Sequence, residues 1–363
     1  MPAPIRIALC CLAAAFSLAA CQPAAPDVSP PAAPTVSQPV AAAADEELRA
    51  YQGDVPGAAL LVIHDGEVVV RRGFGLADLE TARAVTPTTA FRLASISKQF
   101  TATAVLLLAQ DGVLSIDDPA RRWLPELPAS ADAVTLRHLL SHTSGLLDYE
   151  DLMDPADTRQ VHDADVLDLV SRENGGYFDP GTGYRYSNSG YALLALIVER
   201  ASGQRYADFL RERIFLPLGM DSVAFEDGRS QVPERAFGYS FIDEAWQRTD
   251  QSTTSAVLGD GGIYASIDDL ARWDAALYDD RLLHDPWRTL AVTPATATDE
   301  PDVAGYGFGW RLQDGLQWHS GESIGFRNVI LRWPAQRLTV VLLTNRNDPE
   351  PYALARRIAA RWQ

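Results

Sequence analysis

The sequence predicts an α+β fold in which a domain of strands and helices is interrupted by a helical subdomain. A hairpin pattern near the start (residues 55–75) and a strand pair near the end (327–333 and 338–344) provide the sheet. A helical pattern follows the strand pair at 351–362. Between the two groups of strands, helical patterns and proline-marked turns dominate from about 111 to 250. The strand-forming part of the domain is therefore split in sequence around a helical insertion.

The first hairpin has a clear local signal. Residues 60–63 are apolar, Asp65-Gly66 supplies a two-residue turn, and the apolar residues 68–70 continue as the second strand. The elements together set the domain boundaries: 45–363 for the whole domain, about 45–110 and 251–363 for its α/β part, and about 111–250 for the helical insertion.

A buried helix is predicted from Gln99 to Ala109, because this stretch is apolar on almost every face and Asp111-Gly112 ends it. Lys98, directly before this helix, is the only lysine among 31 lysines and arginines. Arginine cannot be deprotonated in a protein, whereas a buried lysine can act as a base. Ser95 lies three residues earlier, so one helical turn would place its hydroxyl beside the amine. Ser-x-x-Lys is typical of a nucleophile with an amine partner.

Two further runs carry polar side chains next to predicted elements. Tyr186 and Asn188 precede a helix predicted over 191–201 and capped by Gly203, so they lie in a loop at its N-terminus. Residues 318–321 read Trp-His-Ser-Gly and precede the C-terminal strand pair. Loops beside helix ends commonly carry functional side chains.

The three runs resemble the motifs of the serine β-lactamase and penicillin-binding protein superfamily. Within it they are most similar to the class C β-lactamase branch with its D-alanyl-D-alanine carboxypeptidase and esterase relatives. That family reads Ser-x-x-Lys, Tyr-x-Asn and Lys/His-Ser/Thr-Gly in this order, and landmarks at 139–146 and 261–271 extend the resemblance from about residue 45 to the C-terminus. The resemblance implies a β-lactamase/transpeptidase-like fold, with an antiparallel sheet flanked by helices, an inserted all-α subdomain and a cleft between them.

The resemblance also implies a role for each matching residue. Ser95 would be the nucleophile, Lys98 its partner and Tyr186 the proton shuttle. Asn188 would orient the amide of the substrate. The implied reaction is that of a serine hydrolase working through an acyl-enzyme, without a metal or an organic cofactor.

The third motif implies the rest of the site. Gly321 precedes Glu322, whose backbone N–H would form the oxyanion hole together with the N–H of Ser95. His319 would face the substrate where many relatives have lysine. Because a histidine with an ordinary pKa near 6.5 is mostly neutral at pH 7, it would attract a substrate carboxylate more weakly than lysine does. Arg327, just beyond the motif, is a candidate for the missing cation.

The substrate stays open among small molecules and peptides, including fragments of peptidoglycan. A D-alanyl peptidase or amidase, an esterase and a β-lactamase are the contending enzyme types, and the neutral histidine favours the first two. The alternative outside this set is a catalytically feeble penicillin-recognising protein of the cell envelope. The full set of Ser95, Lys98, Tyr186 and Asn188 argues against that alternative, since binding alone does not need it.

A competing pattern lies at Gly321–Gly325, which matches the Gly-x-Ser-x-Gly nucleophile elbow around Ser323. The elbow fold needs a histidine after its serine in the chain. The last histidine is His319, before Ser323, so the sequence excludes the elbow mechanism.

Other side chains favour structural roles. His138 and His142 have the spacing of a zinc helix, but the glutamate of that motif is absent, which indicates packing or capping histidines instead of a metal site. Asp148, Tyr149 and Asp151 form an acidic aromatic cluster at the rim of the cleft, for which a solvated loop is expected.

The N-terminus carries a targeting signal. The apolar run 7–20 is too short to span a bilayer and is typical of a signal peptide, predicted here as residues 1–20. Leu18-Ala19-Ala20-Cys21 resembles the bacterial lipoprotein box, which implies lipidation of Cys21 and attachment to a membrane on the periplasmic side of the cell envelope. Gln22 after the cysteine favours the outer membrane over the inner one. Residues 21–44, rich in proline and alanine, are predicted to form an extended tether.

The net charge of −17 disfavours nucleic acid as a partner. The composition is otherwise that of an ordinary globular chain, with 47% hydrophobic and 22% charged residues, so a sizeable core can form.

Overall fold

The computed structural model describes residues 45–225, 232 and 234–363, which all belong to one compact unit. The predicted signal peptide, Cys21 and the tether lie outside the described residues. In the described part of the chain, every helix is too short or too polar to cross a membrane.

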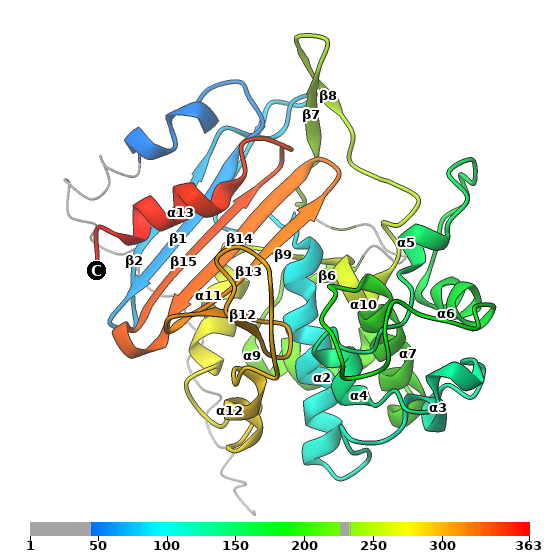
Figure 1. The fold of residues 1–363 in the computed structure, drawn as a ribbon. Coiled ribbons are helices and arrows are strands. Elements are labelled where there is room, and N and C mark those ends of the chain that lie inside the picture. Colours follow the sequence, from blue (N-terminus) through cyan, green and yellow to red (C-terminus); the bar gives the residue numbers. More distant parts are fainter. Residues whose placement is uncertain (1–44, 226–231, 233) are drawn as a thin grey trace, which may run out of the picture. The chain divides into compact units, whose positions relative to one another are not determined.

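An eight-stranded antiparallel sheet is the central layer (Figure 1). Its order, β10-β11-β12-β13-β14-β15-β1-β2, pairs the N-terminal hairpin with the C-terminal strands, from Ala58 opposite Thr344 to Ile63 opposite Thr339. The predicted hairpin and strand pair are therefore confirmed as parts of one sheet. The strands are β1 Ala58–His64, β2 Glu67–Phe74, β10 Thr296–Ala297, β11 Gly305–Tyr306, β12 Arg311–Gln313, β13 Leu316–Ser323, β14 Phe326–Trp333 and β15 Leu338–Thr344.

Both faces of the sheet are covered, which is why β15 is buried along its whole length and β1 along all but its last residue. Helix α13 (Pro351–Ala359) packs on β14 and β15, and its apolar residues belong to the second largest of three hydrophobic clusters. Helix α11 (Ile267–Ala276) packs on β1 and β15 and belongs to the largest cluster. Side chains of β1 alternate between these two clusters: Ala59, Leu61 and Ile63 in the largest one, and Ala58, Leu60 and Val62 in the second largest.

Helix α2 (Lys98–Gln110) is the centre of the helical layer (Figure 1). Its residues from Lys98 to Ala109 are all buried, as the uninterrupted apolar pattern predicts, and it packs against α7 (Asn188–Ser202). Helix α7 ends at Gly203, whose φ of 72° gives the left-handed cap predicted for it. The remaining helices are α3 Ala120–Trp123, α4 Leu136–Leu140, α5 Tyr149–Leu152, α6 Asp163–Ser171, α8 Tyr206–Leu210, a π-helix at Arg211–Phe215, α9 Leu216–Leu218, α10 Leu258–Gly261 and α12 Trp287–Ala291.

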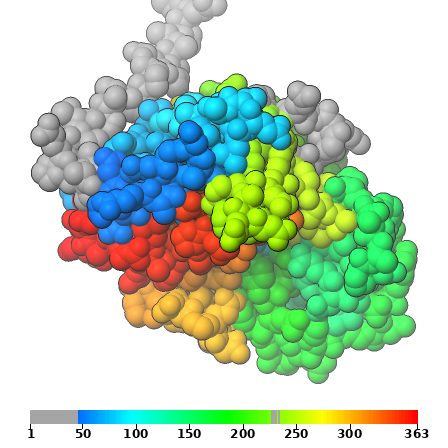
Figure 2. Space-filling model, turned by 90° about the horizontal axis from the view of Figure 1, so that it is seen from above, coloured from blue at the N-terminus to red at the C-terminus, as the bar shows by residue number. Residues whose placement is uncertain are grey.

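The predicted all-α insertion (111–250) is helical only as far as Leu218. Among the described residues after it come short strands, including the hairpin of β7 (Tyr239–Ile242) and β8 (Ala245–Arg248), which the predicted boundary at about 250 had placed in the helical insertion. The physical reason is local: Asp243 and Glu244 both have positive φ (49° and 62°), the backbone of a two-residue hairpin turn. Figures 1 and 2 show this hairpin at the surface. The other short strands are β3 Leu76–Asp78, β4 Arg83–Ala84, β5 Phe91–Arg92, β6 Ala224–Phe225 and β9 Ile263–Ala265.

Candidate active site

The predicted nucleophile and its amine lie side by side. Ser95 is in a 3₁₀ turn, η2 (Ala94–Ser97), that continues directly into α2 at Lys98. Nζ of Lys98 is 3.2 Å from Oγ of Ser95, so the three-residue spacing produces the contact predicted from it. Ala94, just before the serine, has a φ of 48°. This conformation costs a non-glycine residue about 1–3 kcal/mol and is concentrated at functional sites.

The amine of Lys98 is fully buried and has three acceptors around it. Besides Ser95, Nζ donates to Oδ1 of Asn188 at 2.8 Å and to the carbonyl oxygen of Asp260 at 2.9 Å. An ammonium would donate to all three oxygens. A neutral amine would donate to the amide and carbonyl oxygens, which carry no proton, and would turn its lone pair to the Ser95 hydroxyl. The arrangement therefore suits an amine that takes the proton of Ser95.

Asn188 is held at the N-terminus of α7. Ser187 caps this helix by accepting a hydrogen bond from the Gly190 N–H at 3.2 Å. The Asp148 carboxylate accepts from the N–H groups of Asn188 at 2.6 Å and Ser189 at 3.2 Å, where the helix dipole favours negative charge. Asn188 is at the N-terminus of this helix, as predicted, but the helix begins at Asn188 itself and not after a loop that contains it. The expectation of a solvated loop is wrong for Asp148, because these N–H groups bind it in a buried position.

Strand β13 brings the third motif against the turn that holds Ser95. A Cβ on Gly321 would lie 2.0 Å from the carbonyl oxygen of Leu93, so only glycine allows the strand and the turn to approach this closely. The next residue, Glu322, lines a cavity of about 210 Å³ together with Ser95 and Asn188. The predicted site residues Ser95, Asn188 and Glu322 therefore meet at one cavity.

His319 lies on the same strand, three residues before Glu322, and does not line this cavity. Its side chain is fully buried, its Nδ1–H donates to the Ser320 carbonyl at 2.6 Å, and its Nε2 accepts from the Tyr306 hydroxyl at 3.0 Å. Burial, together with the positive charges of Arg311 and Lys98, holds the pKa of His319 well below its usual 6.5. The imidazole is therefore neutral. The direct substrate contact implied for it does not fit this position, because no part of the residue is exposed.

Tyr186 lies between the amine and this histidine. Nζ of Lys98 is 4.9 Å from the centre of the tyrosine ring, and the centres of the Tyr186 and His319 rings are 6.0 Å apart. The Tyr186 hydroxyl is buried without a hydrogen-bond partner among the described residues. A second cavity, of about 420 Å³, is lined by Tyr186 together with Tyr184 and Glu300.

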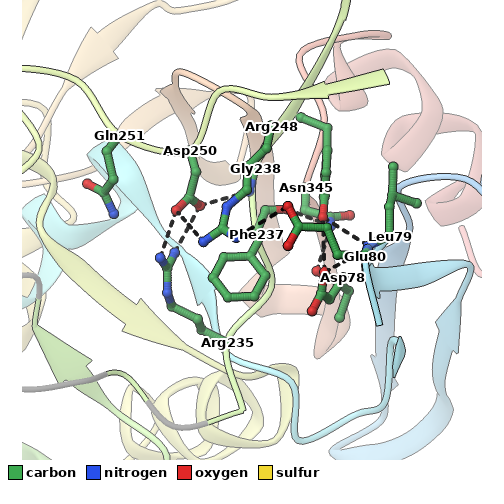
Figure 3. A network of polar contacts seen from close by, with 12 residues as sticks. Asp78, Leu79, Glu80, Arg235, Phe237, Gly238, Arg248, Asp250, Gln251 and Asn345 are labelled. Atoms are coloured by element: carbon green, nitrogen blue, oxygen red, sulfur yellow. Dashed lines mark hydrogen bonds and ion pairs between the residues drawn. The ribbon is translucent and has the colours of Figure 1, made fainter. Parts of the chain in front are cut away.

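One wall of the first cavity is fixed to the sheet by a polar network (Figure 3). Residues of the 251–255 loop line the cavity, and Asp250 fixes the start of this loop. Its carboxylate accepts from Arg235 at 2.7 Å and from the N–H of Gly238 at 2.8 Å. Asn345, directly after β15, donates to the carbonyl of the residue before Gly238 at 2.8 Å. These hydrogen bonds therefore connect the cavity wall to the end of strand β15.

The competing serine, Ser323, also lines this cavity but lies on a different kind of turn from that of a nucleophile elbow. Ser323 lies at the turn from β13 to β14, whereas a nucleophile elbow needs a turn from a strand to a helix. Arg327 donates to the carbonyls of Ser323 and Phe326 at 2.9 Å and lies 3.9 Å from Glu322 and 3.8 Å from Glu350. Carbonyl and carboxylate oxygens thus hold the guanidinium of Arg327 at the strand turn, and this residue does not line the cavity.

The two histidines with zinc-like spacing have the structural roles predicted for them. Nδ1 of His138 accepts from the Thr135 N–H at 3.2 Å in the capping box of α4. His142 is buried, and its Nδ1 accepts from the Ser187 N–H at 3.1 Å. Across the described ranges, three or more histidine, cysteine, aspartate or glutamate side chains nowhere converge as they would around a metal ion.

Asp260 is the part of the site that the sequence does not reveal. Its carbonyl binds Lys98, and its carboxylate accepts from the hydroxyl of Tyr149 at 3.0 Å. Tyr149 is therefore buried, in contrast to the solvated loop expected for it. Burial raises the pKa of Asp260 to about 7, against the opposing charge of Lys98. These contacts join residues more than a hundred positions apart, so no local pattern indicates them.

Comparisons with known proteins agree with this geometry. The family model described as Beta-lactamase matches residues 36–361. The chain belongs to the beta-lactamase family. Penicillin-binding protein 4* of Bacillus subtilis is 35% identical to it over 317 residues, which cover 82% of this chain and 69% of that protein. A D-aminopeptidase of Gluconobacter oxydans is 31% identical over 313 residues, which cover 84% of this chain and 58% of that protein.

A solved structure of similar fold is that of D-amino acid amidase from Ochrobactrum anthropi SV3 complexed with D-phenylalanine. It superposes with a TM-score of 0.78 at 26% identity and covers 89% of this chain and 100% of that chain. The predicted beta-lactamase/transpeptidase-like α+β fold, with its antiparallel sheet and flanking helices, is thereby confirmed.

The pKa of Asp260 leads to a prediction about stability. The carboxyl has a pKa of 3.8 in the unfolded chain and about 7 in the folded one, so between these values the folded protein holds a proton that the unfolded chain has released. This contribution is complete below pH 4 and is lost as the pH rises through 7. Asp260→Asn should therefore gain stability relative to the wild type over this range, by up to about 1.4 kcal/mol for each pH unit.

Urea unfolding at a series of pH values measures the difference. Asp243→Asn, in the exposed tip of the β7–β8 hairpin, is the matched control and should follow the wild-type curve. Parallel curves for Asp260→Asn and the wild type from pH 4 to pH 7 would contradict the prediction.

Proposed function

We propose that this member of the beta-lactamase family is a serine hydrolase that forms an acyl-enzyme at Ser95 and cleaves amides of D-amino acids, including short D-peptides. We place it in the class C-related branch. The observation that carries the proposal is the environment of Lys98, whose buried amine has two proton-free acceptors and the Ser95 hydroxyl around it. Such an amine can take a proton from only one neighbour, the serine.

Acylation then follows in balanced steps. Oγ of Ser95 attacks the carbonyl carbon of the substrate, and its proton passes to Lys98. The N–H groups of Ser95 and Glu322 bind the oxygen that becomes negative. As the tetrahedral intermediate collapses, the C–N bond breaks, and the leaving nitrogen receives a proton through Tyr186, which regains one from Lys98. Asn188 orients the substrate amide.

Deacylation returns the enzyme to its first state. A water molecule attacks the ester carbon of the acyl-enzyme and gives one proton to the Lys98 and Tyr186 pair. The C–O bond to Ser95 then breaks, and Oγ takes this proton back. The sum is hydrolysis of one amide by one water, and none of the steps requires an electron acceptor or donor.

Charge at the cavity supports a substrate that carries an amine. Glu150 and Glu322 both line the cavity, while the position of the third-motif cation holds a neutral histidine. Arg92 also lines the cavity, but its guanidinium donates to the Ser255 carbonyl at 2.9 Å. An ammonium group is favoured beside such carboxylates more than a second carboxylate is. The names of the relatives, a D-aminopeptidase and a D-amino acid amidase, support the same class.

We further propose, on the basis of the predicted N-terminal signals, that this activity lies in the cell envelope. We propose that Cys21 is lipidated and that the tether 21–44 holds the domain on the periplasmic side of the outer membrane. Small peptides released from peptidoglycan would be within reach there.

The substrate proposal is tested by one kinetic panel. The substrates are D-alanine p-nitroanilide, D-alanyl-D-alanine peptides, p-nitrophenyl esters of increasing chain length, and nitrocefin. We expect kcat/KM to be highest for the D-alanyl amides and lowest for nitrocefin. Ser95→Ala should lose at least about 10³-fold in rate, and Ser323→Ala should stay within about tenfold of the wild type.

Each other outcome of the panel identifies an alternative. Nitrocefin as the best substrate would make the protein a β-lactamase, and esters as the best would make it an esterase. Slow turnover of every substrate with stable labelling by penicillin would indicate a recognition protein. Full activity of Ser95→Ala would overturn the nucleophile itself.

Lys98→Arg tests the role of the amine. Arginine keeps the charge and can still donate to Asn188 and Asp260, but it cannot take the proton of Ser95. The rate of acylation should fall by about 10² to 10⁴ with little change in the circular dichroism spectrum. A variant that acylates at the wild-type rate would show that Lys98 is only a structural cation.

Cys21→Ser tests the location. In a Gram-negative host the wild type should sediment with membranes and incorporate radiolabelled palmitate, and the variant should do neither. A wild-type protein that stays soluble and unlabelled would refute lipidation at this cysteine.

A further inference from the structure

Arg311 is a cation next to the third motif that the sequence does not single out. It lies on β12, where it pairs with Trp318 of β13, and its side chain is only 13% exposed. Nη1 donates to Oγ of Ser320 at 3.2 Å, and Nε donates to Glu300 at 3.0 Å. The guanidinium is thereby fixed from two sides, with Ser320 of the third motif as one of its acceptors.

The same guanidinium lies over the ring of Tyr186. Cζ of Arg311 is 5.1 Å from the centre of that ring, and Nζ of Lys98 is 4.9 Å from it. The tyrosine therefore has two cations within about 6 Å, the range over which a ring and a cation attract each other. Its hydroxyl has no hydrogen-bond partner within the described part of the chain, so no hydrogen bond competes with these charges.

We propose that Arg311 supplies the positive charge that the third motif lacks at His319, and that it acts through Tyr186. This proposal rests on the acyl-enzyme function proposed above. When Tyr186 gives its proton to the leaving nitrogen, its oxygen becomes negative until Lys98 returns a proton. Arg311 stabilises that negative oxygen and holds Ser320 in place. It is thus a positioning residue, which needs no contact with the substrate.

Neighbouring charges do not replace or cancel this effect. Glu300, the partner of Arg311, is more exposed at 27% and also accepts a hydrogen bond from the Tyr184 hydroxyl at 2.5 Å, so its charge is shared and screened. Arg327 is bound to carbonyls at the strand turn. The titratable or charged side chains around Tyr186 include, besides Glu300 in the same cavity, Lys98, His142, Tyr184, Tyr191, Tyr306, Arg311 and His319.

Four variants assayed on D-alanine p-nitroanilide test the proposal. Arg311→Gln should lower kcat/KM by about 10- to 100-fold and move its pH profile toward higher pH, because loss of a cation disfavours a negative oxygen in the site. Arg311→Lys should stay within about fivefold of the wild type. His319→Lys added to Arg311→Gln should recover at least about tenfold, because it returns a cation close to Tyr186. Arg327→Gln should leave the pH profile of kcat/KM almost unchanged.

The controls separate this proposal from the function on which it depends. Ser95→Ala reports the acyl-enzyme function, and Arg281→Gln, an exposed arginine paired with Asp279, reports any general effect of charge removal. Wild-type kinetics in Arg311→Gln, while Ser95→Ala is inactive, would overturn the role of Arg311 alone. Equal losses of kcat/KM in Arg311→Gln and Arg311→Lys would also overturn it. The same holds if the double variant is no faster than Arg311→Gln although thermal melting shows that both proteins are folded. A loss of kcat/KM in Arg327→Gln but not in Arg311→Gln would show that Arg327, and not Arg311, has the proposed role.

Discussion

The site depends on burying one amine. Nζ of Lys98 is inaccessible to water, and a buried amine must find its hydrogen-bond partners within the protein. Its acceptors come from three separate segments: the turn with Ser95, the start of α7 at Asn188, and α10 at Asp260. Each segment must reach the same point for the amine to be satisfied. The need of the Lys98 amine for hydrogen-bond partners therefore brings together Ser95, Lys98 and Asn188, the residues proposed as the nucleophile, its partner and the amide that orients the substrate.

The sheet and the helices hold these segments in position by different means. Gly321 lets β13 touch the backbone of the Ser95 turn, which only a residue without Cβ permits. The buried carboxylate of Asp148 holds the N-terminus of α7. Asp250 and Asn345 fix the cavity wall to the end of β15 (Figure 3). The two largest hydrophobic clusters, one on each face of the sheet, give these polar contacts a rigid frame.

Local patterns made part of this structure predictable from sequence. The contact of Ser95 with Lys98 follows from a three-residue spacing, and the cap of α7 from Gly203. Tertiary contacts decide the rest. His319 is neutral because it is buried against Tyr306, and Asp260 reaches Lys98 across the helical layer. Strand β6, after Leu218, pairs with the distant strand β9, which helical and turn patterns in the chain do not indicate.

The account stands on Ser95 becoming the acylated residue, and mapping a trapped adduct tests this most directly. The protein is incubated with a fluorophosphonate and digested with trypsin, and the peptides are sequenced by mass spectrometry. Cleavage after Arg92 and Lys98 releases residues 93–98, while Ser323 falls in residues 312–327. The account predicts the adduct on Ser95 within 93–98. An adduct within 312–327, or on Ser97, would contradict it.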